Sequence, residues 1–135
     1  MEDKIGFVVN YFWPSSLKNG YQLITSATQL GLMLLKKSQV VGSVVLVDGS
    51  PTMDESLREF CLNLYVIYLH AGRKLGLAEG FNLGWKSLSE RYIGYMANDI
   101  LPHPSETLEL LYEYIKRPDV GCVFPCLTDF YDCDY

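Results

Sequence analysis

The sequence predicts an α/β fold of three layers, in which a mostly parallel sheet carries helices on both faces. Short apolar segments of strand length alternate along the chain with segments whose apolar residues recur every three or four positions. The strand-like segments are continuously apolar, which is typical of parallel strands buried on both faces. Because the chain has 135 residues, we expect residues 1–135 to form a single domain.

The first half of the chain is predicted to contain strands bounded by turn residues and helices bounded by charge. A compact β-branched run, Ile5–Asn10, predicts a buried strand, and the periodic segment that begins at Tyr21 predicts an amphipathic helix. This helix is expected to end at Lys36 and Lys37, since cations suit the negative end of a helix dipole. Further along, the same criteria predict a strand at 44–47, a helix at 54–62 and a strand at 64–69.

In the second half, glycine residues recur every fourth position at the start of a segment with helical spacing. The glycines are Gly72, Gly76, Gly80 and Gly84, and the helical segment is expected to end near Glu90. The remaining predicted elements are a strand at 92–96, a helix at 104–117 that begins at a proline, and a fifth strand at 120–127.

The charge balance and the N-terminus exclude several classes of protein. Eleven Lys and Arg residues stand against sixteen Asp and Glu residues, a formal net charge of −5 that would repel a phosphate backbone. We therefore expect no nucleic-acid partner. The N-terminal segment MEDKIGFVVN lacks the cationic start and apolar length of a signal peptide, and no segment approaches the ~20 apolar residues of a membrane span. These features predict a cytoplasmic protein with no membrane span.

The cysteines are expected to be reduced thiols in the core, because no secretion signal supports disulfides. They are Cys61, Cys122, Cys126 and Cys133. A zinc site formed by the last three is the alternative, although their spacing lacks the paired C-x2-C arrangement of common zinc sites.

Two predicted strands end at acidic residues. Asp48 follows the strand at 44–47, and Asp99 follows the strand at 92–96. Because parallel strands have their carboxyl ends at one edge of a sheet, both carboxylates are expected to face one crevice there. Each local pattern also has a structural explanation: Asp-Gly is a turn signal, Asn-Asp suits a helix cap, and glycine allows close packing of a helix on a sheet.

Four segments occur in an order and at a spacing that carry a family resemblance. They are VVNYF at the first strand, VLVDGS at the second, LGLAEGFNLG before the fourth and YMAND at its end. Together they resemble the donor-binding half of nucleotide-sugar glycosyltransferases with the GT-A fold, in particular the inverting, family-2-like branch that includes bacterial rhamnosyltransferases. The resemblance runs from about Ile5 to Pro125. It implies a truncated or minimal glycosyltransferase that uses a UDP- or dTDP-sugar donor with Mg²⁺ or Mn²⁺.

The resemblance also implies where the donor binds. Its implied nucleotide-sugar-binding residues are Asn10, Tyr11, Asp48, Gly49, Ser50, Asn82, Asn98 and Asp99, of which Asp99 would also be the metal ligand. An ionised Asp48 accepts hydrogen bonds only, so it would distinguish the N3–H donor of uracil or thymine from the N3 acceptor of cytosine. Arg73, followed by Lys74, would add positive charge near the diphosphate, and a solvated loop patch explains the pair equally well.

Two departures from the family pattern leave the catalytic group unassigned. Ala97 stands where many relatives carry the first acid of the DXD motif. An inverting transfer needs a carboxylate base, and in the family that base and the acceptor-binding region lie downstream of the last residue of this chain. The acids of the C-terminal segment, Asp129, Asp132 and Asp134, would be either a base or a solvated tail.

The sequence leaves other functions open beside the enzyme. One is a catalytically incomplete nucleotide-sugar-binding module that needs a partner chain or a missing C-terminal half. Another is a different doubly wound domain of receiver or Rossmann type, although the turn after the first strand lacks the G-x-G-x-x-G pattern that cradles a dinucleotide. The acceptor is open among glycan, lipid and protein, and the chain is compatible with a homo-oligomer.

Overall fold

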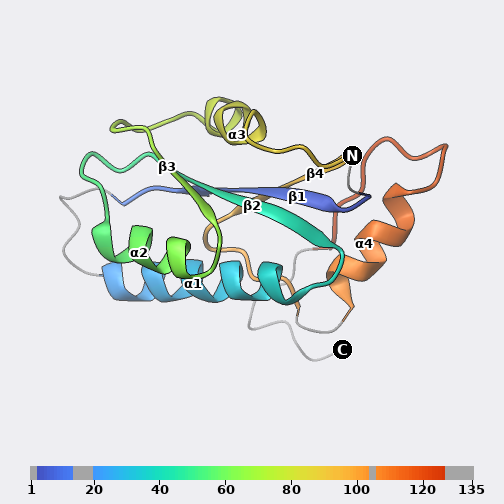
Figure 1. Ribbon diagram of the computed structural model, residues 1–135, viewed down its shortest axis with the longest axis horizontal. Coiled ribbons are helices and arrows are strands. Elements are labelled where there is room, and N and C mark those ends of the chain that lie inside the picture. Colours follow the sequence, from blue (N-terminus) through green and yellow to red (C-terminus); the bar gives the residue numbers. More distant parts are fainter. Residues whose placement is uncertain (1–2, 14–19, 104–105, 127–135) are drawn as a thin grey trace.

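The computed structural model describes residues 3–13, 20–103 and 106–126. Its strands are β1 (Ile5–Tyr11), β2 (Val41–Asp48), β3 (Ile67–His70) and β4 (Tyr92–Ala97), and its helices are α1 (Tyr21–Lys37), α2 (Glu55–Asn63), α3 (Leu77–Trp85) and α4 (Thr107–Ile115). Within the described residues, four strands form one sheet in the order β3-β2-β1-β4, and every neighbouring pair is parallel. Figure 1 shows α1 and α2 on one face of the sheet and α3 on the other. The predicted three-layer α/β fold is confirmed.

The sheet separates two cores, because successive side chains of a strand point to opposite faces. Phe7 and Val9 of β1 belong to the larger core, which lies toward α1 and α2, whereas Val8 belongs to the smaller core. In the smaller core Val8 joins Val45 and Val47 of β2 beneath α3. Both faces of these strands are therefore buried, as their continuously apolar sequences predict.

Helix α3 packs against the sheet through two glycines that are one helical turn apart. A Cβ atom on Gly84 would lie 2.5 Å from Cγ1 of Val8 and 3.0 Å from Cγ2 of Val47. A Cβ atom on Gly80 would lie 2.6 Å from both amide atoms of Asn10. The close-packing explanation of the glycine-rich segment is thus confirmed for Gly80 and Gly84.

Some element boundaries agree with the predicted ones, and others differ. Helix α2 begins as predicted, because the Asp54 side chain accepts a hydrogen bond from the backbone N–H of Leu57 at 3.0 Å. Strand β3 begins at Ile67 rather than at 64, since Tyr65 takes a positive φ of 57° that breaks any extended run. Helix α3 ends at Trp85 rather than near residue 90.

The predicted fifth strand at 120–127 is wrong for its described part, residues 120–126, which form no strand. Phe124 is 84% exposed, and Pro125 has no N–H group to donate to a neighbouring strand. An apolar sequence without a partner strand beside it remains an irregular segment. Leu127 lies outside the described residues.

The cysteine prediction is confirmed only in part. Cys61 of α2 is a fully buried thiol, and burial raises its pKa to about 12. Cys122 and Cys126 are free thiols but exposed, because the segment that carries them is not a strand. Cys133 lies outside the described residues. Among the residues that are described, no helix is long and apolar enough to cross a membrane.

A buried carboxylate closes the amino-terminal edge of the sheet. Glu90 is 7% exposed, its Oε1 accepts from the backbone N–H of Ser43 at 2.5 Å, and its Oε2 accepts from that of Ser89 at 3.1 Å. Gly6 and Gly42 make room for it, since Cβ atoms there would lie 2.8 Å and 2.5 Å from its carboxylate oxygens. Burial alone would raise the pKa of Glu90, but the hydrogen bonds from Ser43 and Ser89 outweigh it and lower the pKa.

Replacing Gly84 with alanine should destabilise the fold. We expect Gly84→Ala to lower the free energy of unfolding by up to about 2 kcal/mol, because overpacking against Val8 and Val47 costs about 1 to 3 kcal/mol and the gain in helix propensity offsets about 1 kcal/mol of it. Urea unfolding measures this difference. Gly121→Ala is the control, since Gly121 is exposed outside the helices and strands and a Cβ atom there meets nothing within 4 Å. Equal effects of the two substitutions would contradict the close packing of α3.

The buried Glu90 should make stability depend on pH in the acid range. Its folded pKa is lowered, so the carboxylate contributes stability above the ordinary glutamate pKa of about 4.3, and the contribution disappears as the pH falls through the folded pKa. Between pH 6 and about pH 3 the parent protein should therefore lose more stability than Glu90→Gln. Urea midpoints across this range test the difference, with Glu59→Gln at an exposed position as the control. Parallel curves for parent and Glu90→Gln would rule out the contribution.

Candidate functional site

A cleft of ≈ 230 Å³ opens at the carboxyl edge of the sheet, where β1, β2 and β4 end. Its walls come from these strand ends, from the loop before α3 and from the first residue of that helix. The lining residues are Asn10, Tyr11, Phe12, Val47, Gly49, Leu75, Leu77, Tyr95, Ala97 and Asn98. A crevice outside the carboxyl ends of parallel strands is the usual ligand site of open α/β sheets.

The floor of the cleft is polar at one point. Nδ2 of Asn10 donates to the hydroxyl oxygen of Tyr95 at 3.2 Å and to the backbone oxygen of Leu77 at 3.5 Å. Oδ1 of Asn10 is buried and has no hydrogen-bond partner among the described residues. The ring of Tyr95 packs edge-on against Phe81 of α3, with 5.7 Å between ring centroids. Neither Tyr95 nor Phe81 is among the residues that the family resemblance implies.

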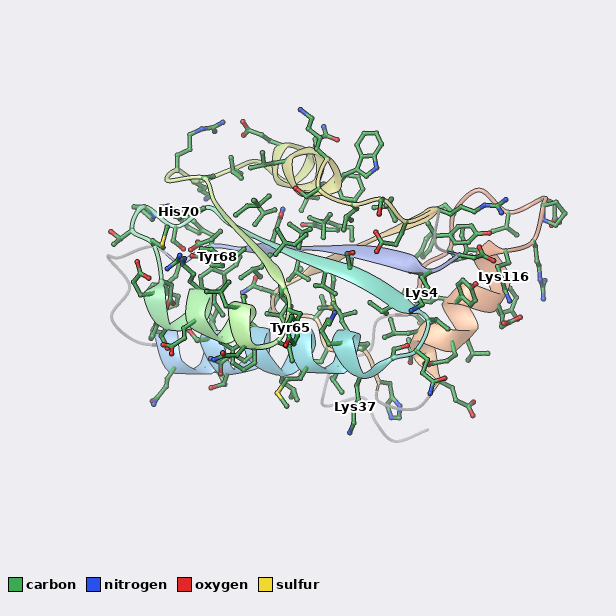
Figure 2. All side chains as sticks on the ribbon, viewed as in Figure 1. Lys4, Lys37, Tyr65, Tyr68, His70 and Lys116 are labelled. Carbon is green, nitrogen blue, oxygen red and sulfur yellow. The ribbon has the colours of Figure 1, made fainter. Side chains whose placement is uncertain are left out.

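The carboxylate of Asp48 does not line the cleft. Because Val47 faces α3, the next residue faces the opposite side of the sheet, and Asp48 is fully buried there. Its Oδ1 accepts from the backbone N–H of Ser50 at 2.8 Å, and its Oδ2 accepts from the hydroxyl of Tyr68 in β3. Figure 2 shows Tyr68 on the side of the sheet that faces α2. Direct contact between Asp48 and a nucleotide base stays a prediction, since the fold itself supplies partners for both oxygens.

The turn after Asp48 is fixed to the ends of the neighbouring strands. The backbone N–H of Gly49 donates to the backbone oxygen of Tyr11 at 2.9 Å. Oγ of Ser50, which is 3% exposed, accepts from the backbone N–H of Trp13 at 2.8 Å. The backbone oxygen of Ser50 lies 2.8 Å from Nε2 of His70, which Figure 2 places at the end of β3. Gly49 is thus held rigidly at the cleft wall.

The ring of Tyr11 belongs to the larger core. It is 2% exposed, and its hydroxyl donates to Oδ2 of Asp54 at 3.4 Å, an oxygen that also accepts from the hydroxyl of Tyr21. Burial raises the pKa of Tyr11, and the charges of Asp54 and Asp48 raise it further. Tyrosine hydroxyls therefore donate to both aspartates, from Tyr68 to the buried Asp48 and from Tyr11 and Tyr21 to the half-buried Asp54.

The two polar residues that follow β4 have different surroundings. The side-chain amide of Asn98 donates to Oγ1 of Thr28 in α1 at 3.4 Å, which ties the end of β4 to that helix. Asp99 is exposed and lies close enough to Tyr95 for its charge to act on the phenol. Burial raises the pKa of Tyr95, the hydrogen bond from Asn10 opposes this, and the charge of Asp99 adds to it. Asp99 does not line the cleft itself, but it directly follows Asn98, which does.

The remaining predicted binding residues lie outside the cleft. Arg73 pairs with Glu79 through both terminal nitrogens, one of them at 3.1 Å from the carboxylate, and both side chains are exposed. Nζ of Lys74 lies 5.2 Å from the ring centroid of Phe12, which lines the cleft. Asn82 is exposed, because α3 turns Gly80 and Gly84 toward the sheet and so turns Asn82 toward solvent. The structure does not bring Asn82 to the cleft.

Some cleft residues could have been identified from the sequence. Tyr95 stands two residues before Ala97, so the period of a strand puts the two side chains on one face. Tyr68 is different, because its contact with Asp48 depends on the pairing of β2 with β3, in which Leu46 lies opposite Tyr68. Within the described residues, no group of three or more His, Cys, Asp and Glu side chains is arranged to hold a metal ion.

Two comparisons with known proteins bear on the function of this cleft. A protein-family model described as "Glycosyl transferase family 2" matches residues 35–135. This match includes β2, β3, α3 and β4, and with them every cleft residue after Phe12. A search of curated proteins found no significant match.

Removing the Tyr68 hydroxyl should weaken the fold at the cleft wall. We expect Tyr68→Phe to lower the free energy of unfolding by about 1 to 3 kcal/mol, the usual contribution of a hydrogen bond to a charged group. Urea unfolding checks the value. Tyr65→Phe is the matched control, because Tyr65 is 87% exposed. A loss no larger than that of the control would show that Asp48 does not depend on this hydroxyl.

Proposed function

The chain belongs to glycosyl transferase family 2, and from this premise we propose that it transfers a sugar from a UDP- or dTDP-sugar to an acceptor hydroxyl. The family makes the protein a glycosyltransferase that uses a nucleotide-sugar donor. The pyrimidine base of the donor, inversion at the sugar, and an acceptor that is a glycan, a lipid or a protein are parts of this proposal. Membership of the branch that includes bacterial rhamnosyltransferases is also part of the proposal, and it rests on the four sequence segments that resemble that branch.

The observation that carries the proposal is that Asp99 is exposed and directly follows the cleft-lining residue Asn98. A donor with its nucleoside between the Gly49 turn and Leu77 would carry its diphosphate toward the end of β4, where this carboxylate is exposed. The apolar side chains of Phe12, Leu75 and Leu77 suit the faces of a base and ribose. In this arrangement Asp48 acts on the base through the turn that it holds.

A divalent cation fits this site as a partner of the diphosphate. Ala97 offers no side-chain oxygen and the Asn98 amide is bonded to Thr28, so Asp99 would be the single protein carboxylate. Mg²⁺ and Mn²⁺ are commonly held by one or two carboxylates, with phosphate oxygens and water as the other ligands. Such an ion would neutralise the charge that develops on the diphosphate as it leaves.

A second candidate is a donor-binding module that acts with a partner chain or a further segment. The observation that favours it is the composition of the cleft, since no lining residue in the described part of the chain carries a carboxylate or an imidazole. An inverting transfer needs such a base near the acceptor hydroxyl. The tail acids Asp129, Asp132 and Asp134 lie outside the described residues.

A donor panel tests the proposal. We expect UDP- and dTDP-sugars to raise the melting temperature more than GDP- and CMP-sugars, and Mn²⁺ to enlarge the shift. A ligand at 100 times its Kd stabilises the fold by about 2.7 kcal/mol, which thermal-shift measurements resolve. Asp99→Asn should remove the part of the shift that depends on Mn²⁺, whereas Asp119→Asn, at an exposed position after α4, should retain it.

The same panel separates the two candidate functions. Transfer or donor hydrolysis by the isolated chain would support the enzyme, and donor binding with neither activity would support the module. If no pyrimidine sugar nucleotide shifts the melting temperature, the proposed donor is wrong. An unchanged response to Mn²⁺ in Asp99→Asn would refute the metal assignment alone.

A further inference from the structure

The floor of the cleft holds a hydrogen-bond donor and an acceptor that the fold does not use. The Tyr95 oxygen accepts from Nδ2 of Asn10, so its own hydrogen remains to be donated, and no described residue accepts it. Oδ1 of Asn10 is a buried acceptor with no donor among the described residues. The unused donor and the unused acceptor lie close together. The Tyr95 hydroxyl is 3.2 Å from Nδ2 of Asn10, and Oδ1 belongs to the same side-chain amide.

A single hydroxyl group satisfies both atoms at once. A hydroxyl accepts one hydrogen bond and donates another, whereas a carbonyl or phosphate oxygen only accepts and an ammonium only donates. A ligand that fills this part of the cleft without supplying both an acceptor and a donor leaves Asn10 Oδ1 and the Tyr95 hydrogen unpaired, which lowers affinity.

Neighbouring groups hold this pair in place. The Tyr95 ring packs against Phe81 of α3, and Nδ2 of Asn10 also reaches the backbone oxygen of Leu77 at 3.5 Å. Gly80 allows α3 to lie directly on the amide, since any Cβ atom there would be 2.6 Å from it. The orientation of the pair is therefore set before a ligand arrives.

We propose that Asn10 and Tyr95 together bind one hydroxyl group of the sugar nucleotide and so select donors that carry it. The inference rests on the proposed function, because it takes the cleft as the donor site. The hydroxyl belongs either to the ribose or to the transferred sugar, and both present the same chemistry to the pair. Tyr95 is thus a specificity-determining residue of the cleft.

Titration calorimetry of the full chain with Mn²⁺ tests the proposal. The probes are UDP, 2′-deoxy-UDP, 3′-deoxy-UDP and UDP-glucose, with parent protein and Tyr95→Phe. We expect the parent to bind the probe that carries the recognised hydroxyl about tenfold more tightly than the probe that lacks it, the effect of one hydrogen bond. In Tyr95→Phe this ratio should fall toward one, because only the hydroxyl-bearing probe loses affinity.

The pattern of loss identifies the source of the hydroxyl. Weaker binding of UDP with unchanged binding of one deoxy-UDP assigns the hydroxyl to the ribose, and weaker binding of UDP-glucose with unchanged UDP assigns it to the transferred sugar. Tyr92→Phe is the matched control, since Tyr92 lies on the same strand but packs against Tyr112 in the larger core. This control should leave every ratio unchanged.

Other results overturn the inference. Equal weakening of all four probes in Tyr95→Phe would mean that Tyr95 supports the fold or contacts a group that all four share, and no weakening would mean that it binds nothing. Equal affinity of the parent for all four probes would overturn the inference even if Tyr95→Phe failed to fold. A parent that binds none of them, and no dTDP-sugar in the donor panel either, contradicts the proposed donor itself.

Discussion

The alternation of side chains along parallel strands decides which residues reach the cleft. At the carboxyl edge, Asn10, Val47 and Tyr95 point toward α3, whereas Tyr11 and Asp48 point into the larger core. A site on this edge can therefore use only every second side chain of each strand. The polar groups that point the other way must find partners inside the fold, because buried polar groups without hydrogen bonds are costly.

Those partners give the cleft a rigid wall. Asp48 is bonded to Ser50 and Tyr68, and Asp54 is bonded to Tyr11 and to the first backbone turn of α2. The acids and phenols thus connect β1, β2, β3 and α2 beneath the turn that carries Gly49. A turn fixed in this way holds its backbone in one position, which is the condition for selective binding of a flat ring.

The sequence predicted the fold better than it predicted the orientation of the site. The bounds of α1 and β1 follow from periodicity and flanking charge, which are local properties, and the structure agrees with them closely. The strand at 120–127 failed because its apolar residues say nothing about whether a neighbouring strand is present. The match to glycosyl transferase family 2 supports the family resemblance. The resemblance identified which strand ends form the site, but not the direction in which each side chain points.

Three residues show that the sequence predicts the position of a residue more readily than the direction of its side chain. Asn82 lies on the helix that the resemblance indicated, but two glycines turn that helix so that Asn82 faces solvent. Asp48 lies at the carboxyl end of β2 as expected, but its side-chain partner is a tyrosine 20 residues later, which strand pairing brings to it. Tyr95 could have been found from the period of β4, because that period is short and local.

The order of the strands has a consequence for how the protein associates. Within the described residues β3 and β4 are the outermost strands, so each has one side whose backbone N–H and C=O groups meet no neighbouring strand. Strand β3 is only four residues long, whereas β4 has six, and a longer unpaired edge is the better template for an incoming extended segment. Of the two sheet edges in the described part of the chain, the β4 side is therefore the one at which an added strand would form the longer ladder.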